Sequence, residues 1–317
     1  MSVDKSREHL YYIDILRIIS VLAVLFAHVN LDYVYWCYWS VVLFTVISGG
    51  LMLTHDRIDI KRLYTVNIFR VVTAFFFWSC VYSLSEHVLL PHRDGKYVNF
   101  KLMITSIFEG HFHLWYCYMI IGLFILAPFI KAAIEYDEKI GLYFLVIAFF
   151  FSILVPALQE LRPFAWTTGI TGNIGLGGFR FAAYFVLGYY LMKYKPDKYL
   201  RRILLVAGVP ALILFVLFAR SSMRTVLETC IAAWLFLLAE SFFTIKNKWV
   251  ASFIAMLGDA VFGVYLIHEL FNMIYDRMFG LTYTGLYDFG KYLFTVLLSF
   301  ICIILIRKKH RIAGFIS

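Results

Sequence analysis

The first long apolar segment of the chain, near residues 11–30, carries three ionisable side chains whose spacing suits a functional site. Arg17 and His28 are eleven residues apart, and eleven steps of roughly 100° return to nearly the same face of a helix, about 16 Å further along. Asp14 lies one turn before Arg17, where it can neutralise the guanidinium. Charged groups are costly inside a membrane, so they suggest a function. A buried ion pair, with a histidine that reaches the outer interface, is the structural alternative.

A second group of cations, Lys61, Arg62 and Arg70, precedes and enters the third apolar segment. Ordinary anchoring at the cytoplasmic surface is enough to explain Lys61 and Arg62. It explains Arg70 less well, because a long apolar run follows this residue. Arg70 would enter the membrane about one turn from the cytoplasmic side, and together with Arg17 it would form a basic vestibule that opens toward the cytoplasm. Such a vestibule suits a phosphorylated ligand.

Histidines in the run EGHFHLWYCYM, before the fourth apolar segment, are expected on the opposite side of the membrane. His111, His113 and Glu109 together resemble part of a metal site. No further ligands with ordinary spacing follow, so we expect no metal. A hydrogen-bonding role near His28 is the favoured interpretation of this group.

Two further segments carry polar groups whose roles stay open. The glycine-rich stretch at 167–181, TTGITGNIGLGGFRF, contains Arg180. Its backbone would approach a ligand closely, or it is simply a flexible loop; it lies in no strand–turn–helix unit and is no dinucleotide fingerprint. His268 and Glu269 fall inside the ninth apolar segment, where an interhelical hydrogen bond explains them at least as well as a catalytic role.

The composition identifies the elements that must position these groups. Hydrophobic residues make up 62% of the 317 residues and charged residues 15%, with a mean hydropathy of +0.80, whereas soluble domains are about 45–50% apolar. These values exclude a soluble globular, disordered or coiled-coil protein and predict an all-α polytopic membrane protein. Ten spans are expected, near residues 11–30, 34–54, 66–90, 113–134, 140–160, 176–194, 199–219, 227–245, 255–277 and 285–306, with an amphipathic interfacial helix at 97–110.

The distribution of Lys and Arg predicts the orientation of these spans. With the N-terminus inside, cytoplasmic segments hold 18 of these residues and outer loops hold 7. This asymmetry favours both termini in the cytoplasm. It also accounts for the net charge of +9 without a nucleic-acid partner. Connections are short, so residues 1–317 are expected to form one integral-membrane domain with no separate soluble domain.

The run YYIDILRIISVLAVLFAHV resembles the first helix of the membrane-bound acyltransferase family 3, whose Arg-X10-His signature matches Arg17 and His28. Further matches follow in the family's order over nearly the whole chain: FTVISGGLML, NIFRVVTAFFFWS, HLWYCYMIIGLFILAPFI, YFVLGYYL and GVYLIH. The chain is similar to the single-domain O-acetyltransferases of surface glycans. It departs from the family at the third helix, where an Arg-X-X-Arg pattern is common but Asn67 takes the first position and only Arg70 matches.

The resemblance implies transfer of an acetyl group from cytoplasmic acetyl-CoA, a co-substrate, to a hydroxyl of an extracytoplasmic or lipid-linked glycan. No permanently bound cofactor is implied. The protein would lie among the lipids of a bacterial-type cytoplasmic membrane and modify polysaccharide of the cell envelope. His28 would be the general base, by direct transfer or through a transient acyl-histidine. The expected site residues are His28, Arg17 and Asp14 for catalysis, Arg17, Arg70 and Arg62 for the donor, and His113, Glu109 and Arg180 on the acceptor side.

Two other functions fit intramembrane charges. A multi-pass transporter of a glycan precursor or small anion would use Arg, His, Asp and Glu in its pathway. A non-catalytic membrane sensor is the third possibility. The asymmetric layout, with cations inside and histidines outside, favours a site that takes two substrates from opposite sides of the membrane.

Overall fold

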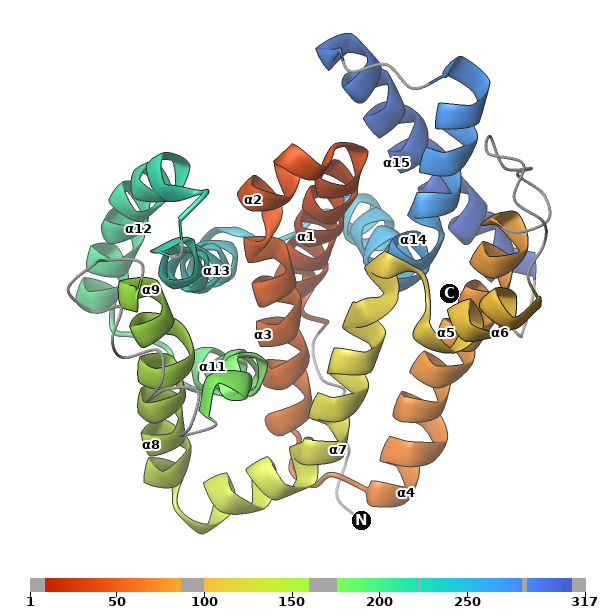
Figure 1. Ribbon diagram of the computed structural model, residues 1–317. Helices are drawn as coiled ribbons and strands as arrows, with labels where there is room; N and C mark the ends of the chain where they lie inside the picture. Colours follow the sequence, from red (N-terminus) through yellow and green to blue (C-terminus); the bar gives the residue numbers. More distant parts are fainter. Residues whose placement is uncertain (1–8, 87–99, 160–175, 222, 281–283, 310–317) are drawn as a thin grey trace.

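The computed structural model describes residues 9–86, 100–159, 176–221, 223–280 and 284–309, and every element in these ranges is a helix (Figure 1). Nine helical segments in the described ranges are long and apolar enough to cross a membrane. These helices confirm the all-α polytopic membrane fold. The span predicted at 176–194 corresponds to α11 (Arg180–Lys193), which is shorter at 14 residues but packs its buried residues against α3 and α8.

The other long helices follow the predicted spans, and the largest shift of a start is seven residues, in the ninth span, which begins at 248 instead of 255. They are α1 (Tyr11–Val29), α3 (Trp39–Leu53), α5 (Phe69–Leu84), α7 (Trp115–Tyr136), α8 (Glu138–Phe149), α12 (Lys198–Phe218), α13 (Met223–Phe242), α14 (Lys248–Phe279) and α15 (Gly285–Lys309). The described chain also contains the short helices α2 (Val34–Cys37), α4 (Ile60–Arg62), α6 (Phe100–Glu109) and α9 (Val155–Gln159), and a π-helical segment, Phe150–Leu154, that joins α8 to α9. Short 3-10 turns lie at Leu31–Tyr33, Phe112–Leu114 and Leu176–Phe179. α6 is the amphipathic helix expected at 97–110.

The third span begins earlier than the predicted residue 66. Asp59 caps α4, because its side chain accepts a hydrogen bond from the backbone N–H of Arg62 at 3.2 Å. A π-helical turn, Leu63–Ile68, then joins α4 to α5 without a break. Arg70 therefore lies ten residues, about 15 Å, into the helical segment instead of about one turn. The predicted end of this span, at 87–90, lies outside the described residues.

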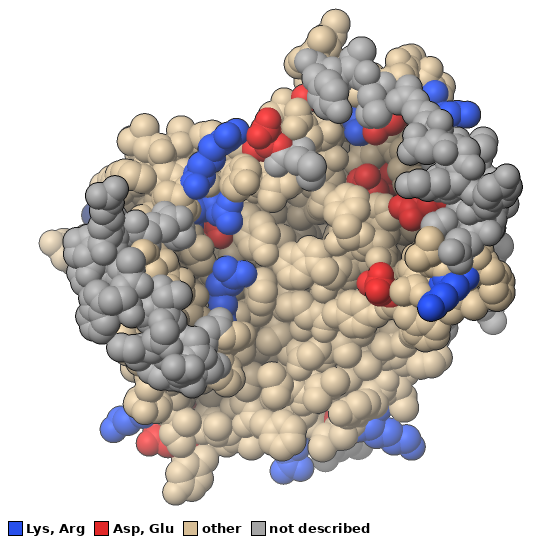
Figure 2. Space-filling model, viewed as in Figure 1, with Lys and Arg blue, Asp and Glu red and all other residues tan. Residues whose placement is uncertain are grey.

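The surface of the bundle matches a lipid environment. Large apolar side chains face outward on several spans; Phe129, Val206 and Leu217 are each at least 70% exposed. Figure 2 shows a broad uncharged band on one face, between a lower rim of charged side chains and a second group of charges above it. Apolar surface of this extent is stable only against lipid.

The helices form two groups on either side of α1 and α3 (Figure 1). α14 packs against α1 and α15, whereas α11 packs against α3, and α12 packs against α13. α7, drawn in yellow, runs between α3 and α5 and contacts both. This arrangement leaves α1, α3, α5, α7 and α14 around a common interior.

Glycines bring α3 and α11 unusually close together. A Cβ atom on Gly188 would collide with the carbonyl oxygen of Val46, and one on Gly49 would collide with the carbonyl oxygen of Phe185. Small residues at such crossings let two membrane helices approach at backbone distance, where van der Waals packing is strongest. The crossing holds α3, one wall of the interior, in place.

We expect Gly188→Ala to destabilise the protein by about 1–3 kcal/mol, since the added methyl group must push the two backbones apart. The measurement is the midpoint of thermal unfolding in detergent. Gly122→Ala in α7 is the matched control, because a Cβ there meets nothing within 4 Å and alanine favours a helix over glycine. Equal midpoints for the Gly188 variant and the parent would contradict the close crossing.

Candidate active site

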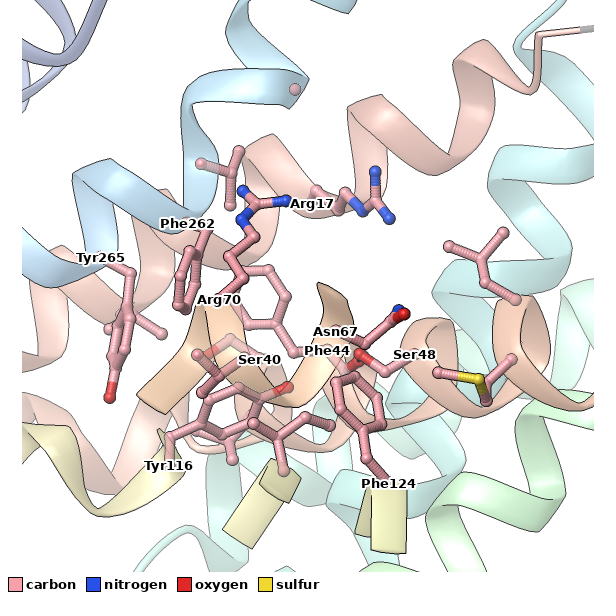
Figure 3. A pocket seen from close by; sticks show the side chains of 18 of the residues that line it. Arg17, Ser40, Phe44, Ser48, Asn67, Arg70, Tyr116, Phe124, Phe262 and Tyr265 are labelled. Carbon is pink, nitrogen blue, oxygen red and sulfur yellow. The ribbon is translucent and has the colours of Figure 1, made fainter. Parts of the chain in front are cut away.

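A cavity of about 690 Å³ lies in the interior between α1, α3, α5, α7 and α14. Arg17 and His28 both line it, so it follows α1 for about 16 Å. Figure 3 shows Arg17 and Arg70 projecting into it from different helices, above a group of aromatic side chains. Arg17 and His28, which the sequence predicted on one face of the helix, therefore face the same cavity.

One end of the cavity is cationic. Five arginines of the described chain line it: Arg17, Arg57, Arg62, Arg70 and Arg307. Arg307 lies 3.8 Å from the carboxylate of Asp259, which also lines the cavity, and the Arg70 guanidinium lies 5.4 Å from the ring centre of Phe262. Asp59 also lines the cavity, but two carboxylates do not balance five arginines, so this end attracts anions.

The structure brings together the three arginines that the sequence predicted for donor binding, and it adds two. Arg57 follows α3, and Arg307 is near the end of α15. In the sequence both were counted only among the cytoplasmic charges, because nothing in their local sequence shows that they lie near α1 in the fold. Lys61, the neighbour of Arg62, does not line the cavity.

Asp14 supports Arg17 from outside the cavity. Its side chain is 5% exposed and lies 3.6 Å from the Arg17 guanidinium and 2.5 Å from His9 Nε2. A Cβ on Gly258 would come within 2.7 Å of the Asp14 side chain, so α14 packs directly over it. Asp14 therefore orients Arg17 without facing the cavity.

The opposite end of the cavity holds a cluster of imidazoles. His28 and His113 line it, and their ring centres are 6.2 Å apart. His268 is fully buried beside both: its Nε2 is 3.2 Å from His28 Nδ1, and its ring centre is 4.9 Å from that of His113. His113 thus lies near His28, as its segment suggested. The sequence left the role of His268 open, because it showed only that this residue lies in the ninth span.

His111 connects this cluster to a carboxylate that the sequence did not single out. Its Nδ1 is 2.8 Å from His113 Nδ1, and its Nε2 is 3.0 Å from Glu86 Oε1. Glu109, which the sequence placed on the acceptor side with His113, is exposed at the end of α6 and does not line the cavity. The reason is that Gly110, at φ 75°, turns the chain between α6 and the histidines.

Arg180 lies near the histidine end but not in the cavity. It starts α11, and its guanidinium lies 5.0 Å from the ring centre of Phe181. Phe181 in turn packs against Trp115, which lines the cavity, at 5.7 Å between ring centres. Most of the glycine-rich stretch, residues 167–175, lies outside the described residues.

Aromatic side chains separate the two polar ends. Tyr116 lies 5.8 Å from Tyr265 and 6.2 Å from Phe44, ring centre to ring centre, and all three line the cavity. Figure 3 shows these rings with Phe124 and Phe262 around the middle of the space. The middle therefore suits a thin, weakly polar group and disfavours a hydrated ion.

This geometry sets what the site can do. A phosphate-bearing molecule could be held by the arginines while a narrow arm reaches the imidazoles. An imidazole is a general base or nucleophile at neutral pH. Within the described ranges, no group of three or more His, Cys, Asp or Glu side chains is placed to hold a metal ion.

One of the comparisons with known proteins identifies a family. A family model described as an acyltransferase domain matches residues 10–308, which is nearly the whole chain. The match includes both ends of the cavity and the helices that build it. No curated protein and no solved structure matches the chain.

Proposed function

The chain belongs to acyltransferase family 3 and is a multi-pass membrane acyltransferase; from this premise we propose that it transfers an acetyl group from cytoplasmic acetyl-CoA to a hydroxyl of an extracytoplasmic or lipid-linked glycan. One observation carries the proposal: a single cavity joins five arginines at one end to His28 at the other. The donor and acceptor would then meet inside the membrane from opposite sides.

The cationic end suits coenzyme A, which carries several phosphate charges at one end of a long, thin arm. Arginine guanidinium groups pair with phosphates through two hydrogen bonds at once. Asn67, where the family often has arginine, lines the cavity with Arg70. Arg57 and Arg307 supply positive charge at the same end, and in this proposal they replace the missing arginine.

The donor arm would pass the aromatic middle of the cavity and present its thioester to His28. In direct transfer, the acceptor oxygen attacks the carbonyl carbon while His28 takes the hydroxyl proton. The new C–O bond forms, the C–S bond breaks, and His28 returns the proton to the departing thiolate. Protons therefore balance within the site, and no net proton is released.

Residues near the outer end are candidates for holding the acceptor. His113 lines the cavity next to His28, and Trp115 adds an aromatic face of the kind that packs against sugar rings. Arg180 contacts the ring of Phe181, which packs against Trp115 at this end of the cavity. Because Glu109 is exposed on α6, we assign it at most a contact with a part of the acceptor remote from the reacting hydroxyl.

The test is an acyl-transfer assay with sidedness. Purified protein is reconstituted into proteoliposomes with glycolipid extracted from bacterial envelopes, and acetyl-labelled acetyl-CoA is added to one side. We expect ester-linked label only from protein molecules whose cytoplasmic face is exposed to the added donor. Permeabilising the vesicles gives the donor access to the oppositely oriented molecules, and these should then also form labelled ester. The orientation is read from protease access to a tag after residue 317. Label that crosses the membrane without an ester bond would support the transporter instead, and absence of both donor consumption and product would contradict the proposal.

A further inference from the structure

His268 is the buried group in direct contact with His28. It lies in α14, is 0% exposed, and does not line the cavity. Its Nε2 is 3.2 Å from His28 Nδ1, and its own Nδ1 is 2.6 Å from the carbonyl oxygen of Tyr265. It therefore contacts His28 from the side away from the cavity and cannot reach a substrate.

The backbone carbonyls determine which nitrogen atoms carry protons. A carbonyl oxygen only accepts, so the 2.9 Å contact between His28 Nδ1 and the Val24 oxygen requires a hydrogen on Nδ1. In the same way, the contact with the Tyr265 oxygen places a hydrogen on His268 Nδ1. A neutral His268 then has a lone pair on Nε2, which accepts from the same His28 Nδ1–H.

This pattern leaves His28 Nε2 without a hydrogen. Nδ1 and Nε2 of a neutral imidazole share a single proton, and two acceptors hold it on Nδ1. His28 Nε2 has no hydrogen-bond partner in the described parts of the chain, and the residue lines the cavity. The basic nitrogen is thus the one that is available to a substrate.

We propose that His268 is a positioning residue that holds His28 in the Nδ1–H form and stabilises the positive charge that develops when Nε2 takes the acceptor proton. The inference rests on the proposed role of His28 as a base. When the proton arrives at Nε2, the charge is shared with Nδ1–H, and that bond donates to His268 Nε2 and to Val24. A neutral imidazole can accept this hydrogen bond in a buried position, where an unpaired carboxylate would cost a large desolvation free energy.

The surrounding hydrogen bonds keep the two rings in register. Asn272 Nδ2 lies 3.4 Å from the His28 carbonyl oxygen, and Thr295 of α15 donates to Asn272 Oδ1 at 2.7 Å. On the other side, the Tyr265 hydroxyl donates to the His113 carbonyl oxygen. α14 is therefore held against α1, α15 and the turn before α7 around His268, and these contacts maintain the distance between the two rings.

Two substitutions of nearly equal size separate positioning from packing. In His268→Gln, the side-chain amide reaches the place of Nε2, so its oxygen can still accept from His28 Nδ1–H. In His268→Asn, the shorter amide reaches the place of Nδ1, so the contact with Tyr265 survives and the one with His28 is lost. We expect the Asn variant to lower kcat about 10- to 100-fold with KM for acetyl-CoA within about twofold, and the Gln variant to stay within about threefold of the parent.

A measurement that does not need turnover completes the test. In protein labelled with ¹⁵N-histidine, the His28 signals are those that disappear in His28→Gln. The parent should show a protonated Nδ1 and an unprotonated Nε2, the Gln variant should match it, and the Asn variant should show a mixture of both forms. Equal kcat values for the Asn variant and the parent, or a parent spectrum with Nε2 protonated, would overturn the positioning role while acyl transfer itself stands. If the parent transfers no acyl group, the proposed function fails, and the spectrum still decides whether His268 sets the tautomer.

Discussion

Replacing His28 with alanine is expected to lower kcat for acetyl transfer by about 10²- to 10⁴-fold, the range that a positioned general base contributes. The acceptor hydroxyl would lose the group that takes its proton, and the departing thiolate would lose the group that returns it. KM for acetyl-CoA should change little, because the phosphate groups would be held by arginines about 16 Å away along α1. The measurement is the initial rate of ester-linked label under saturating donor.

His55→Ala is the matched control for this substitution. His55 also lines the cavity, but it lies beyond the end of α3, two residues before Arg57 of the cationic end. Removing an imidazole there should leave kcat within about threefold, since it is far from the reacting groups. A His28 variant with more than a tenth of the parent kcat would exclude His28 as the base.

Replacing Arg70 with methionine should raise KM for acetyl-CoA about 10- to 100-fold with a smaller effect on kcat. Methionine keeps much of the side-chain length and contact with Phe262 but removes the charge. A hydrogen bond to a charged group contributes about 1.5–3 kcal/mol, which corresponds to this change in affinity. We therefore expect weaker binding of the donor, with little change in the rate of the chemical step.

Two controls test whether the phosphates are what Arg70 holds. Lys61→Met removes one positive charge from the same region, but Lys61 does not line the cavity, so KM should stay within about twofold. Acetyl-pantetheine lacks the nucleotide phosphates, so the parent and the Arg70 variant should use this truncated donor equally well. If the variant loses as much with acetyl-pantetheine as with acetyl-CoA, Arg70 acts on the arm or on the fold and not on the phosphates.

The short-range features of the site were predictable from the sequence. Helix geometry relates Asp14, Arg17 and His28 within α1, and the apolar runs indicated the spans. The third span shows the limit of this reasoning. Its start was placed at 66 because the polar residues before it resemble a loop, whereas the Asp59 cap and a π-helical turn continue the helix. Arg70 consequently lies further from the start of its helical segment than predicted.

The long-range features were decided by tertiary structure alone. His268 meets His28 across 240 residues, Arg307 lines the same cavity as Arg17 from the far end of the chain, and Glu86 lies beside His111. Each pairing depends on how two helices are rotated and how closely they cross. Close packing of small residues such as Gly49 and Gly188, together with buried hydrogen bonds, selects that rotation. A helical period records which residues share a face, but it contains no information about which face of another helix lies opposite.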